Sequence, residues 1–291
     1  MNAEAAPQLL ALFCSMSYAG ALVSSRLGLR YSTPTTVTLV SILVQNSALW
    51  AAVYWTGGIP QVAPIALGLI CIVGILQLGV RLLAYTGVLK IGASRSSTLQ
   101  SISPLVSATI AIAVLGETTT PLIVGGTLLV IAGVVMVSWK AEREIAGFRW
   151  RHLLLPIGAA CLTGLNHPMR RYALGLSNEP LFFAAFMGAI SLLGFLLYMG
   201  FAPAKEPLIW NRQAVWPFLS TGIFETSSLV LIITAISIGP VVVVAPIAAS
   251  YPVWALIGAK WFLHDLEKIT WKTVVGILSV VAGTAAIHFG R

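Results

Sequence analysis

Charged residues are scarce in this sequence. Asp, Glu, Lys and Arg make up 9% of its 291 residues, where an ordinary soluble domain carries about 25%. A water-soluble fold of this size could not cover its surface with so few charges. Hydrophobic residues account for 58% of the chain, and the mean hydropathy is +0.92. The composition excludes a soluble globular protein, a disordered chain and a fibrous protein, and it indicates that lipid surrounds most of the chain.

Motifs for nucleotide hydrolysis, hydrolytic catalysis and metal binding are also missing. The sequence contains no G-x-x-x-x-G-K-[ST] phosphate loop, no H-E-x-x-H and no G-x-S-x-G. The four histidines and three cysteines are scattered, without metal-ligand or disulfide spacing. We therefore expect no metal, no cofactor and no enzymatic activity. A lipid-modifying enzyme that uses Glu225 or His167 as a base is the alternative.

Long apolar runs are what the sequence does contain. A run of about 20 apolar residues crosses a bilayer as a helix, and ten such runs can be drawn. The opening Met-Asn-Ala-Glu lacks the basic region of a signal peptide, so the first run is expected to remain as a span. The fold class is therefore all-α and polytopic. The predicted spans 1 to 10 cover residues 8–26, 35–56, 63–89, 91–115, 119–139, 152–173, 180–201, 213–237, 240–262 and 270–289.

The two halves of the chain repeat each other. The matching pairs, offset by 147 to 150 residues, are Cys14 and Cys161, Gly74 and Gly222, Gln77 and Glu225, Pro104 and Pro252, Glu117 and Asp265, Gly126 and Gly276, and Gly133 and Gly283. Each copy has five spans, an odd number, so the second copy enters the membrane in the opposite sense. We predict a first repeat over 1–139, a polar linker over 140–151 and a second repeat over 152–291. Such inverted repeats are typical of carriers, and a duplicated structural membrane protein is the alternative.

The end of each half resembles the EamA-type pattern of the drug/metabolite transporter (DMT) superfamily. That pattern is a proline in the fourth span, an acid after it, and a fifth span with two glycines seven residues apart. It reads Pro104…Leu115-Gly116-Glu117…Gly126…Gly133, and again Pro252…Leu263-His264-Asp265…Gly276…Gly283. The second copy departs at His264-Asp265, where the family usually has Gly-Glu. The resemblance implies a ten-helix carrier whose central cavity is lined by spans 1–4 and 6–9, with spans 5 and 10 at the side.

Lys and Arg are distributed unevenly between the predicted loops. Most of them follow spans 1, 3, 5, 7 and 9, whereas Arg170, Arg171 and Arg291 fall on the other side. The positive-inside rule then places the central linker in the cytoplasm and both termini outside. Many relatives are drawn with cytoplasmic termini, so the orientation stays open.

Arg81 in span 3 and Glu225 in span 8 are the ionisable residues expected deep within spans. A charge at this depth is costly and marks a functional site by default. Arg81 suits a carboxylate, and Glu225 suits an ammonium group or a coupled proton. The alternative is that the two pair with each other and hold the spans together. In a third interpretation Arg81 lies nearer a span end and extends to the interface.

Neutral side chains complete the predicted substrate site. They are Gln77, Tyr85, Gln100, Asn166, His167, Tyr251 and Trp254. Gln77, Arg81 and Tyr85 follow each other at one-turn spacing and share a helical face. The sequence Asn166-His167-Pro168 either breaks span 6 and exposes backbone groups to substrate, or only kinks it. Tyr18 and Asn46 are expected to pack rather than to bind.

These features predict a secondary carrier for a small organic metabolite, an amino acid or a related amphipathic solute. We expect an exporter that works by alternating access, with Glu225 as the coupling candidate. A channel, a lipid flippase and a membrane-embedded enzyme are the alternatives. The net charge of +8 indicates positive-inside bias rather than nucleic-acid binding. The expected partners are the substrate, membrane lipid and a second copy packed through spans 5 and 10. The expected location is the bacterial inner (plasma) membrane.

Overall fold

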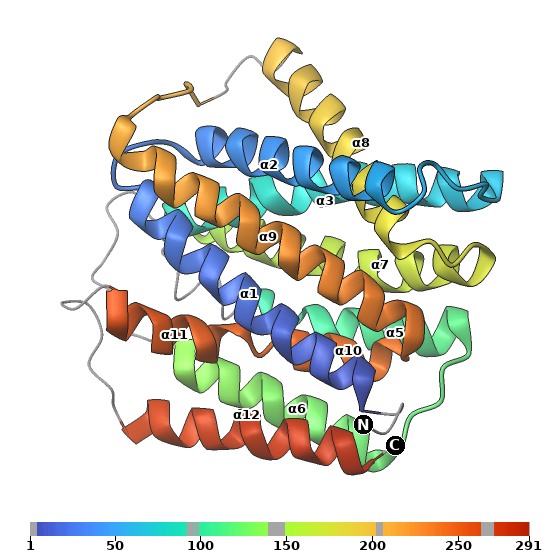
Figure 1. The fold of residues 1–291 in the computed structure, drawn as a ribbon. Coiled ribbons are helices and arrows are strands. Elements are labelled where there is room, and N and C mark those ends of the chain that lie inside the picture. The colour runs from blue at the N-terminus through green and yellow to red at the C-terminus, as the bar shows by residue number, and fades with distance from the viewer. Residues whose placement is uncertain are drawn as a thin grey trace.

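The structure is a computed structural model that describes residues 5–91, 96, 99–138, 149–201, 206–262 and 271–290 (Figure 1). Every regular element in these ranges is a helix. The predicted linker 140–151 is described only from residue 149. The acid Asp265, predicted as the counterpart of Glu117, lies outside the described residues.

The helices of the first half begin and end where local signals place them. They are α1 (Ala6–Gly28), α2 (Pro34–Trp55), α3 (Pro64–Ile91), α5 (Ser103–Leu115) and α6 (Pro121–Ser138). At the start of α2, the Thr33 hydroxyl accepts a hydrogen bond from the backbone N–H of Thr36 at 3.4 Å, a regular N-cap. Gly116 ends α5 with a φ of 65°, a left-handed conformation that glycine adopts at little cost.

The second half repeats this order of elements. It contains the short 3-10 helix η1 (Trp150–Leu153), then α7 (Leu154–Leu176), α8 (Pro180–Phe201), α9 (Arg212–Ile238), α10 (Val241–Ala248), α11 (Tyr251–Phe262) and α12 (Trp271–Phe289). These bounds lie within a few residues of the predicted spans, except in span 9, which is divided into two helices. In span 4, the described helix α5 covers only the second half of the predicted run.

The helices are interrupted just before a proline in both of these spans. Pro104 is the second residue of α5, after a turn at Ser101, and Pro252 is the second residue of α11, after a turn at Ser250. Proline has no N–H to continue a preceding helix and is accepted in a first turn. By contrast, α7 continues through Pro168, so the predicted break at Asn166-His167-Pro168 does not occur. The helix interruptions lie in spans 4 and 9 instead.

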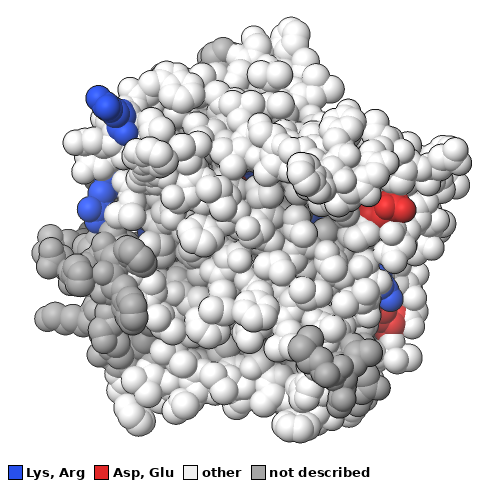
Figure 2. Space-filling view, in the orientation of Figure 1, with Lys and Arg blue, Asp and Glu red and all other residues white. Residues whose placement is uncertain are grey.

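Within the described ranges, five helices are long and apolar enough to cross a membrane. They are Ala6–Gly28, Pro34–Trp55, Pro64–Gly87, Pro180–Phe201 and Arg212–Ile238. Shorter apolar helical segments cover Ser103–Leu115, Pro121–Met136, Val241–Ala255 and Val274–Phe289. In the space-filling view, almost all visible charged side chains lie near the left and right edges, with a broad uncharged belt between them (Figure 2). The chain is thus an integral, multi-pass membrane protein.

The helices of the two halves pack in reciprocal pairs (Figure 1). α1 lies along α9, and its counterpart α7 lies along α3. In the same way α2 packs against α9 while α8 packs against α3, and α1 packs against α11 while α7 packs against α5. The two copies therefore interlock: each buries its helices largely against the other copy.

α6 and α12 lie at one side and touch through the glycines of the repeat. A Cβ added to Gly126 would lie 2.7 Å from the carbonyl oxygen of Gly283, and one added to Gly133 would lie 2.6 Å from that of Gly276. Residue numbers fall along α12 as they rise along α6, so the two helices are antiparallel. Only glycine allows backbones this close. Gly126, Gly133, Gly276 and Gly283 therefore face each other within one chain, and the second copy expected at spans 5 and 10 stays a prediction.

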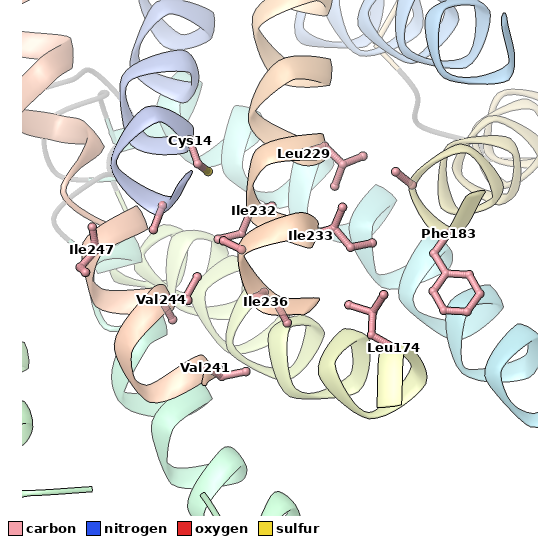
Figure 3. Packing of buried hydrophobic residues seen from close by; sticks show 14 of the residues in the cluster. Cys14, Leu174, Phe183, Leu229, Ile232, Ile233, Ile236, Val241, Val244 and Ile247 are labelled. Atoms are coloured by element: carbon pink, nitrogen blue, oxygen red, sulfur yellow. The ribbon is translucent and has the colours of Figure 1, made fainter. Parts of the chain in front are cut away.

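A cluster of buried apolar side chains joins α1, α7, α8, α9 and α10 at one end of the bundle (Figure 3). Its members, called here the apolar cluster, include Cys14, Leu174, Phe183, Leu229, Ile232, Ile233, Ile236, Val241 and Val244. Each of these residues is at most 8% exposed. The apolar cluster binds the start of α1 to the end of α9 and the start of α10, across the boundary between the repeats.

We expect Gly126→Ala to destabilise the protein and Gly125→Ala to leave it unchanged or slightly stabilised. The first Cβ would meet the backbone of α12, whereas a Cβ at Gly125 has nothing within 4 Å. Overpacking of this kind costs about 1–3 kcal/mol, and alanine is otherwise the better helix former. Thermal unfolding in detergent measures both. Equal unfolding temperatures for the two variants would contradict the close packing of α6 on α12.

Candidate functional site

The polar stripe of α3 faces the interior of the bundle. Gln77, Arg81 and Tyr85 lie at successive turns of this helix, and their side chains reach three neighbouring helices. Gln77 contacts α7, Arg81 contacts α2 and α9, and Tyr85 contacts α9. α3 thus holds a line of polar groups where the two repeats meet.

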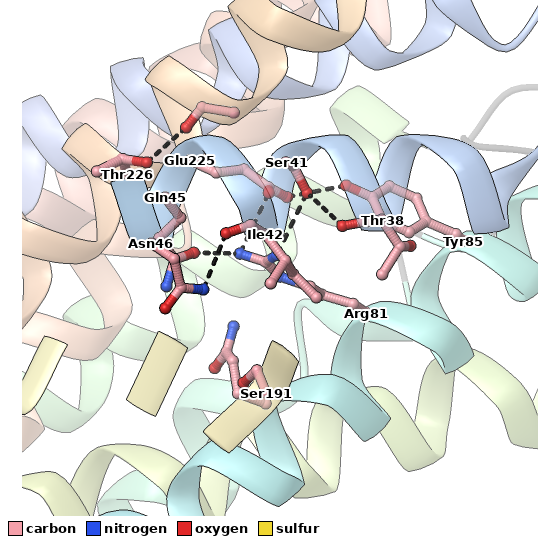
Figure 4. A network of polar contacts seen from close by, with 12 residues as sticks. Thr38, Ser41, Ile42, Gln45, Asn46, Arg81, Tyr85, Ser191, Glu225 and Thr226 are labelled. Atoms are coloured by element: carbon pink, nitrogen blue, oxygen red, sulfur yellow. Dashed lines mark hydrogen bonds and ion pairs between the residues drawn. The ribbon is translucent and has the colours of Figure 1, made fainter. Parts of the chain in front are cut away.

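Arg81 is the most fully engaged of these groups (Figure 4). It is 7% exposed. Its Nη2 donates to Oε1 of Gln45 at 2.6 Å and lies 3.2 Å from Oε2 of Glu225, and its Nη1 donates to Oγ of Ser41 at 3.2 Å. A buried guanidinium is stable only when its charge and its donors are matched in this way. Ser41 and Gln45, which hold Arg81 from α2, were not among the predicted residues.

Glu225 joins Arg81 to Tyr85. Its Oε1 accepts a hydrogen bond from the Tyr85 hydroxyl at 2.8 Å, while Oε2 faces Arg81. Both ionised side chains are 8% exposed, and both line the cavity described below. The two interpretations of this pair, cavity lining and mutual pairing, therefore hold together. Opposite charges that are shielded from water attract each other strongly, so the pair also fixes α3 against α9.

A second buried guanidinium lies on α7. Arg170, which is 3% exposed, donates from Nη2 to Oε1 of Gln77 at 2.7 Å, and Asn166 donates to the same oxygen at 3.4 Å. The charge count assigned Arg170 and Arg171 to the loop side at the end of span 6, but α7 continues to Leu176 and both arginines lie within this helix. The expectation that Arg81 is the one deeply placed cation fails for the same reason. Arg170 follows Asn166 by one helical turn, which was the available sign that the two share a face.

A cavity of about 170 Å³ lies between the two repeats. Its lining comes from α1, α3, α5, α7, α9, α10 and α11, and from Gln100 ahead of α5. Predicted site residues in the lining are Gln77, Arg81, Tyr85, Gln100, His167, Glu225 and Tyr251. Further polar lining residues that were not predicted to bind are Cys14, Tyr18, Arg26, Ser103, Thr163, Arg170 and Ser228.

Two predicted site residues stand outside this lining, and Tyr18, which was expected only to pack, stands within it. Trp254 is not part of the lining, and Asn166 acts only through Gln77. Tyr18 lines the cavity and packs edge-on against Tyr251, with ring centroids 4.8 Å apart. Tyr18 therefore packs as expected, but it does so in the cavity wall. A helix that is apolar on most sides gives no sign of which aromatic residue will meet an opening.

The cavity has one sealed end. Cys14, Leu229 and Ile232 belong both to its lining and to the apolar cluster, which closes it on the side where α1 begins and α9 ends. In the other direction the lining continues to Arg26, in the last turn of α1. That is the side of the loops rich in Lys and Arg.

Glu117 connects the first repeat to α10 of the second repeat at the sealed end of the cavity. Its Oε1 and Oε2 accept hydrogen bonds from the backbone N–H groups of Val241 and Val242, at 2.9 and 3.0 Å. These donors begin α10 and have no partner within the helix. A carboxylate at this position also matches the positive end of the helix dipole. The acid of the repeated motif is thus an N-terminal cap for a helix of the other half.

The cavity offers hydrogen-bonding and charged groups next to an apolar wall, which suits binding of an amphipathic solute. Among the residues that the structure describes, no group of three or more His, Cys, Asp or Glu is placed to hold a metal ion.

Comparison with known proteins agrees with this architecture. The model of the EamA-like transporter family matches residues 6–139 and, a second time, residues 150–289. A solved structure described only as "Crystal structure of protein" superposes with a TM-score of 0.76, at 16% identity, over 96% of this chain and 95% of that chain. At this identity the likeness shows a shared fold. No curated protein gives a significant match.

Removal of one member of the Arg81–Glu225 pair should destabilise the protein more than removal of both. Arg81→Gln leaves Glu225 without its charge partner, and loss of one partner of a buried pair costs about 3–5 kcal/mol. The double variant Arg81→Gln with Glu225→Gln should recover a large part of that loss. Thermal unfolding in detergent gives the comparison, with the exposed Arg30→Gln as the control. Additive effects of the two single changes would show that the groups do not interact.

Proposed function

Because the chain belongs to the EamA-like transporter family, it is a membrane transporter of the DMT superfamily, and we propose that it is a secondary carrier that exports a small amphipathic metabolite, an amino acid or a close relative of one. The observation that carries this proposal is the cavity between the repeats, closed at one end by the apolar cluster. A site enclosed by two interlocked repeats, with access blocked on one side, is what alternating access requires.

The proposed mechanism is movement of one repeat against the other about the cavity, with ten spans arranged as two inverted repeats. The antiparallel packing of α6 on α12 and the reciprocal helix pairs support this arrangement. The interruptions before Pro104 and Pro252 are where spans 4 and 9 bend. Separation of α10 from the start of α1 would open the sealed end, and Glu117 would have to release α10 or move with it.

The proposed substrate is small. The cavity of about 170 Å³ is below the roughly 300–1,000 Å³ of pockets for drug-sized ligands. A polyanion such as a nucleotide would need several free cations, and one of the lining arginines, Arg81, is already matched by Glu225. The apolar part of the lining, which includes Leu22, Val80 and Ala248, suits an aliphatic or aromatic side chain.

The proposed direction is export. The cavity lining continues toward Arg26, on the side of the loops rich in Lys and Arg, and the positive-inside rule places such loops in the cytoplasm. A carrier at rest with its site open to the cytoplasm is ready to take up an internal solute. We place this activity in a bacterial inner membrane, with a second copy of the chain packed at α6 and α12.

Glu225 is the proposed coupling residue. Among the described residues it is the one carboxylate in the cavity lining. It already binds both Arg81 and Tyr85. Protonation of Glu225 would remove the charge that holds Arg81 and so loosen α3 from α9. A proton would then favour one arrangement of the repeats over the other.

Proteoliposomes loaded with a mixture of unlabelled amino acids should take up labelled amino acid by counterflow. Glu225→Gln should keep counterflow, because glutamine still accepts a hydrogen bond from Tyr85, but it should lose at least about tenfold of the accumulation driven by a pH gradient. Rates are compared per amount of folded protein, with the exposed Glu179→Gln as the matched control. Absence of counterflow with every amino acid tested would move the substrate to another class. An unchanged response to the pH gradient would exclude Glu225 as the coupling residue.

Cysteine labelling should report reciprocal access to the two ends of the cavity. In a variant without Cys14, Cys71 and Cys161, we expect Ser103→Cys to react with a water-soluble reagent, because Ser103 lines the cavity. We expect Ile236→Cys, in the apolar cluster, to be protected until transported amino acids are added.

A cysteine on the outer face of α6, Leu128→Cys, serves as the control for this labelling, because Leu128 is 51% exposed and lies away from the cavity. Its labelling should not depend on amino acids. Identical labelling of Ser103→Cys and Ile236→Cys under all conditions would contradict alternating access.

A further inference from the structure

Arg170 carries a positive charge that no described carboxylate balances. Its contacts are with a neutral amide: Nη2 donates to Oε1 of Gln77 at 2.7 Å. Nε of Arg170 is buried and has no hydrogen-bond partner. Arg170 as a residue is 3% exposed, yet it lies in the wall of the cavity. It is therefore shielded from bulk water but open to whatever enters the site.

The repeat shows what Arg170 lacks. Gln77 on α3 and Glu225 on α9 are matching positions in the two halves. Gln77 accepts a hydrogen bond from Arg170, and Glu225 forms an ion pair with Arg81. Arg81 faces the carboxylate of Glu225, so its charge is matched within the protein. Arg170 faces the amide of Gln77, which accepts its hydrogen bond but carries no charge. Gln77 and Glu225 are thus matching positions that each lie next to an arginine, and only Glu225 supplies a negative charge.

This difference in net charge has a large effect on the free energy of each site within a membrane. A buried cation without an anion is unfavourable, and removal of its hydration is offset only by charge pairing and hydrogen bonds. In the cavity wall, the charged groups that the structure describes are Arg26, Arg81, Arg170 and Glu225. Glu225 already binds Arg81 and Tyr85, so its negative charge does not balance Arg170. An anionic group brought by a solute would complete the environment of Arg170.

We infer that Arg170 binds the carboxylate of the transported solute, with Gln77 fixing the orientation of the guanidinium. This inference rests on the proposed carrier function and names the group that the site recognises. Nη2 donates to Gln77, and a carboxylate in the cavity would pair with the charge of the guanidinium and with its remaining donors. The rest of the solute would lie against the apolar wall and the Tyr18–Tyr251 pair. Arg81, in contrast, is a positioning residue.

Binding to the purified full-length protein in detergent tests this inference independently of transport. The probes are matched pairs of acid and amide: 3-phenylpropionate with 3-phenylpropionamide, and butyrate with butyramide. We expect the acids to raise the unfolding temperature of the wild type saturably and the amides to have at least about tenfold weaker effect. Loss of a charge-assisted contact corresponds to roughly 10- to 100-fold in affinity.

Two opposite changes at the site should have the same result. Arg170→Gln removes the cation, and Gln77→Glu supplies a permanent internal anion of nearly the same shape. Both should weaken binding of the acids by about 10- to 100-fold and abolish the preference for acid over amide. The control is the exposed Arg30→Gln, which removes one positive charge away from the cavity. Because Gln77→Glu keeps the acceptor for Arg170, it also carries the test if Arg170→Gln does not fold.

The inference is overturned if the wild type shows no preference for acids, or if both variants keep it. The proposed function can fail separately. Acid binding that depends on Arg170, without counterflow of any amino acid, would support the anion site and reject the proposed substrate. Counterflow that persists in Arg170→Gln with unchanged affinity would support the carrier and reject the anion site.

Discussion

The structure depends on the rule that a polar group inside a membrane must find its partner within the protein, because lipid supplies none. The Arg81–Glu225 pair satisfies this rule with helices from both halves of the chain: Ser41 and Gln45 come from α2, Tyr85 from α3 and Glu225 from α9. A single buried charge thus fixes the register of three helices. Arg81, Tyr85 and Glu225 of this network line the cavity between the two repeats. The apolar cluster closes one end of that cavity.

The sequence predicts the helices and the repeat well, because both follow from patterns that are local or periodic. The run of apolar residues that forms α8 is predicted over the same residues that the structure assigns, Pro180–Phe201. The stripe of Gln77, Arg81 and Tyr85 follows from the spacing of a helix, and all three line the cavity. The family resemblance carried by Pro104, Glu117 and the glycines is confirmed by the family match over both halves.

The sequence could not predict properties that depend on which helix faces which. Arg170 and Arg171 are neighbours in the chain, yet Arg170 turns toward Gln77 while Arg171 donates to backbone carbonyls of Ile236 and Ser237 at the end of α9. Two adjacent arginines are typical of a loop. Only the packing of α7 against α3 and α9 shows that the two side chains bind different helices. Glu117 is a similar case. Its place after span 4 was visible, but the helix that it caps begins more than a hundred residues later.

The pairing of α1 with α9 has a consequence for how the chain is made. α1 is synthesised first, but the helix along which it lies ends at Ile238. Until that point has left the ribosome, the face of α1 that carries Gly20 and Gly28, which lie close to the Phe224 and Phe218 rings of α9 in the finished protein, has no permanent neighbour. Contacts between residues so distant in sequence form late and slowly. The first repeat is therefore inserted in the bilayer before its packing partners exist. Its assembly depends on how soon the second repeat is synthesised.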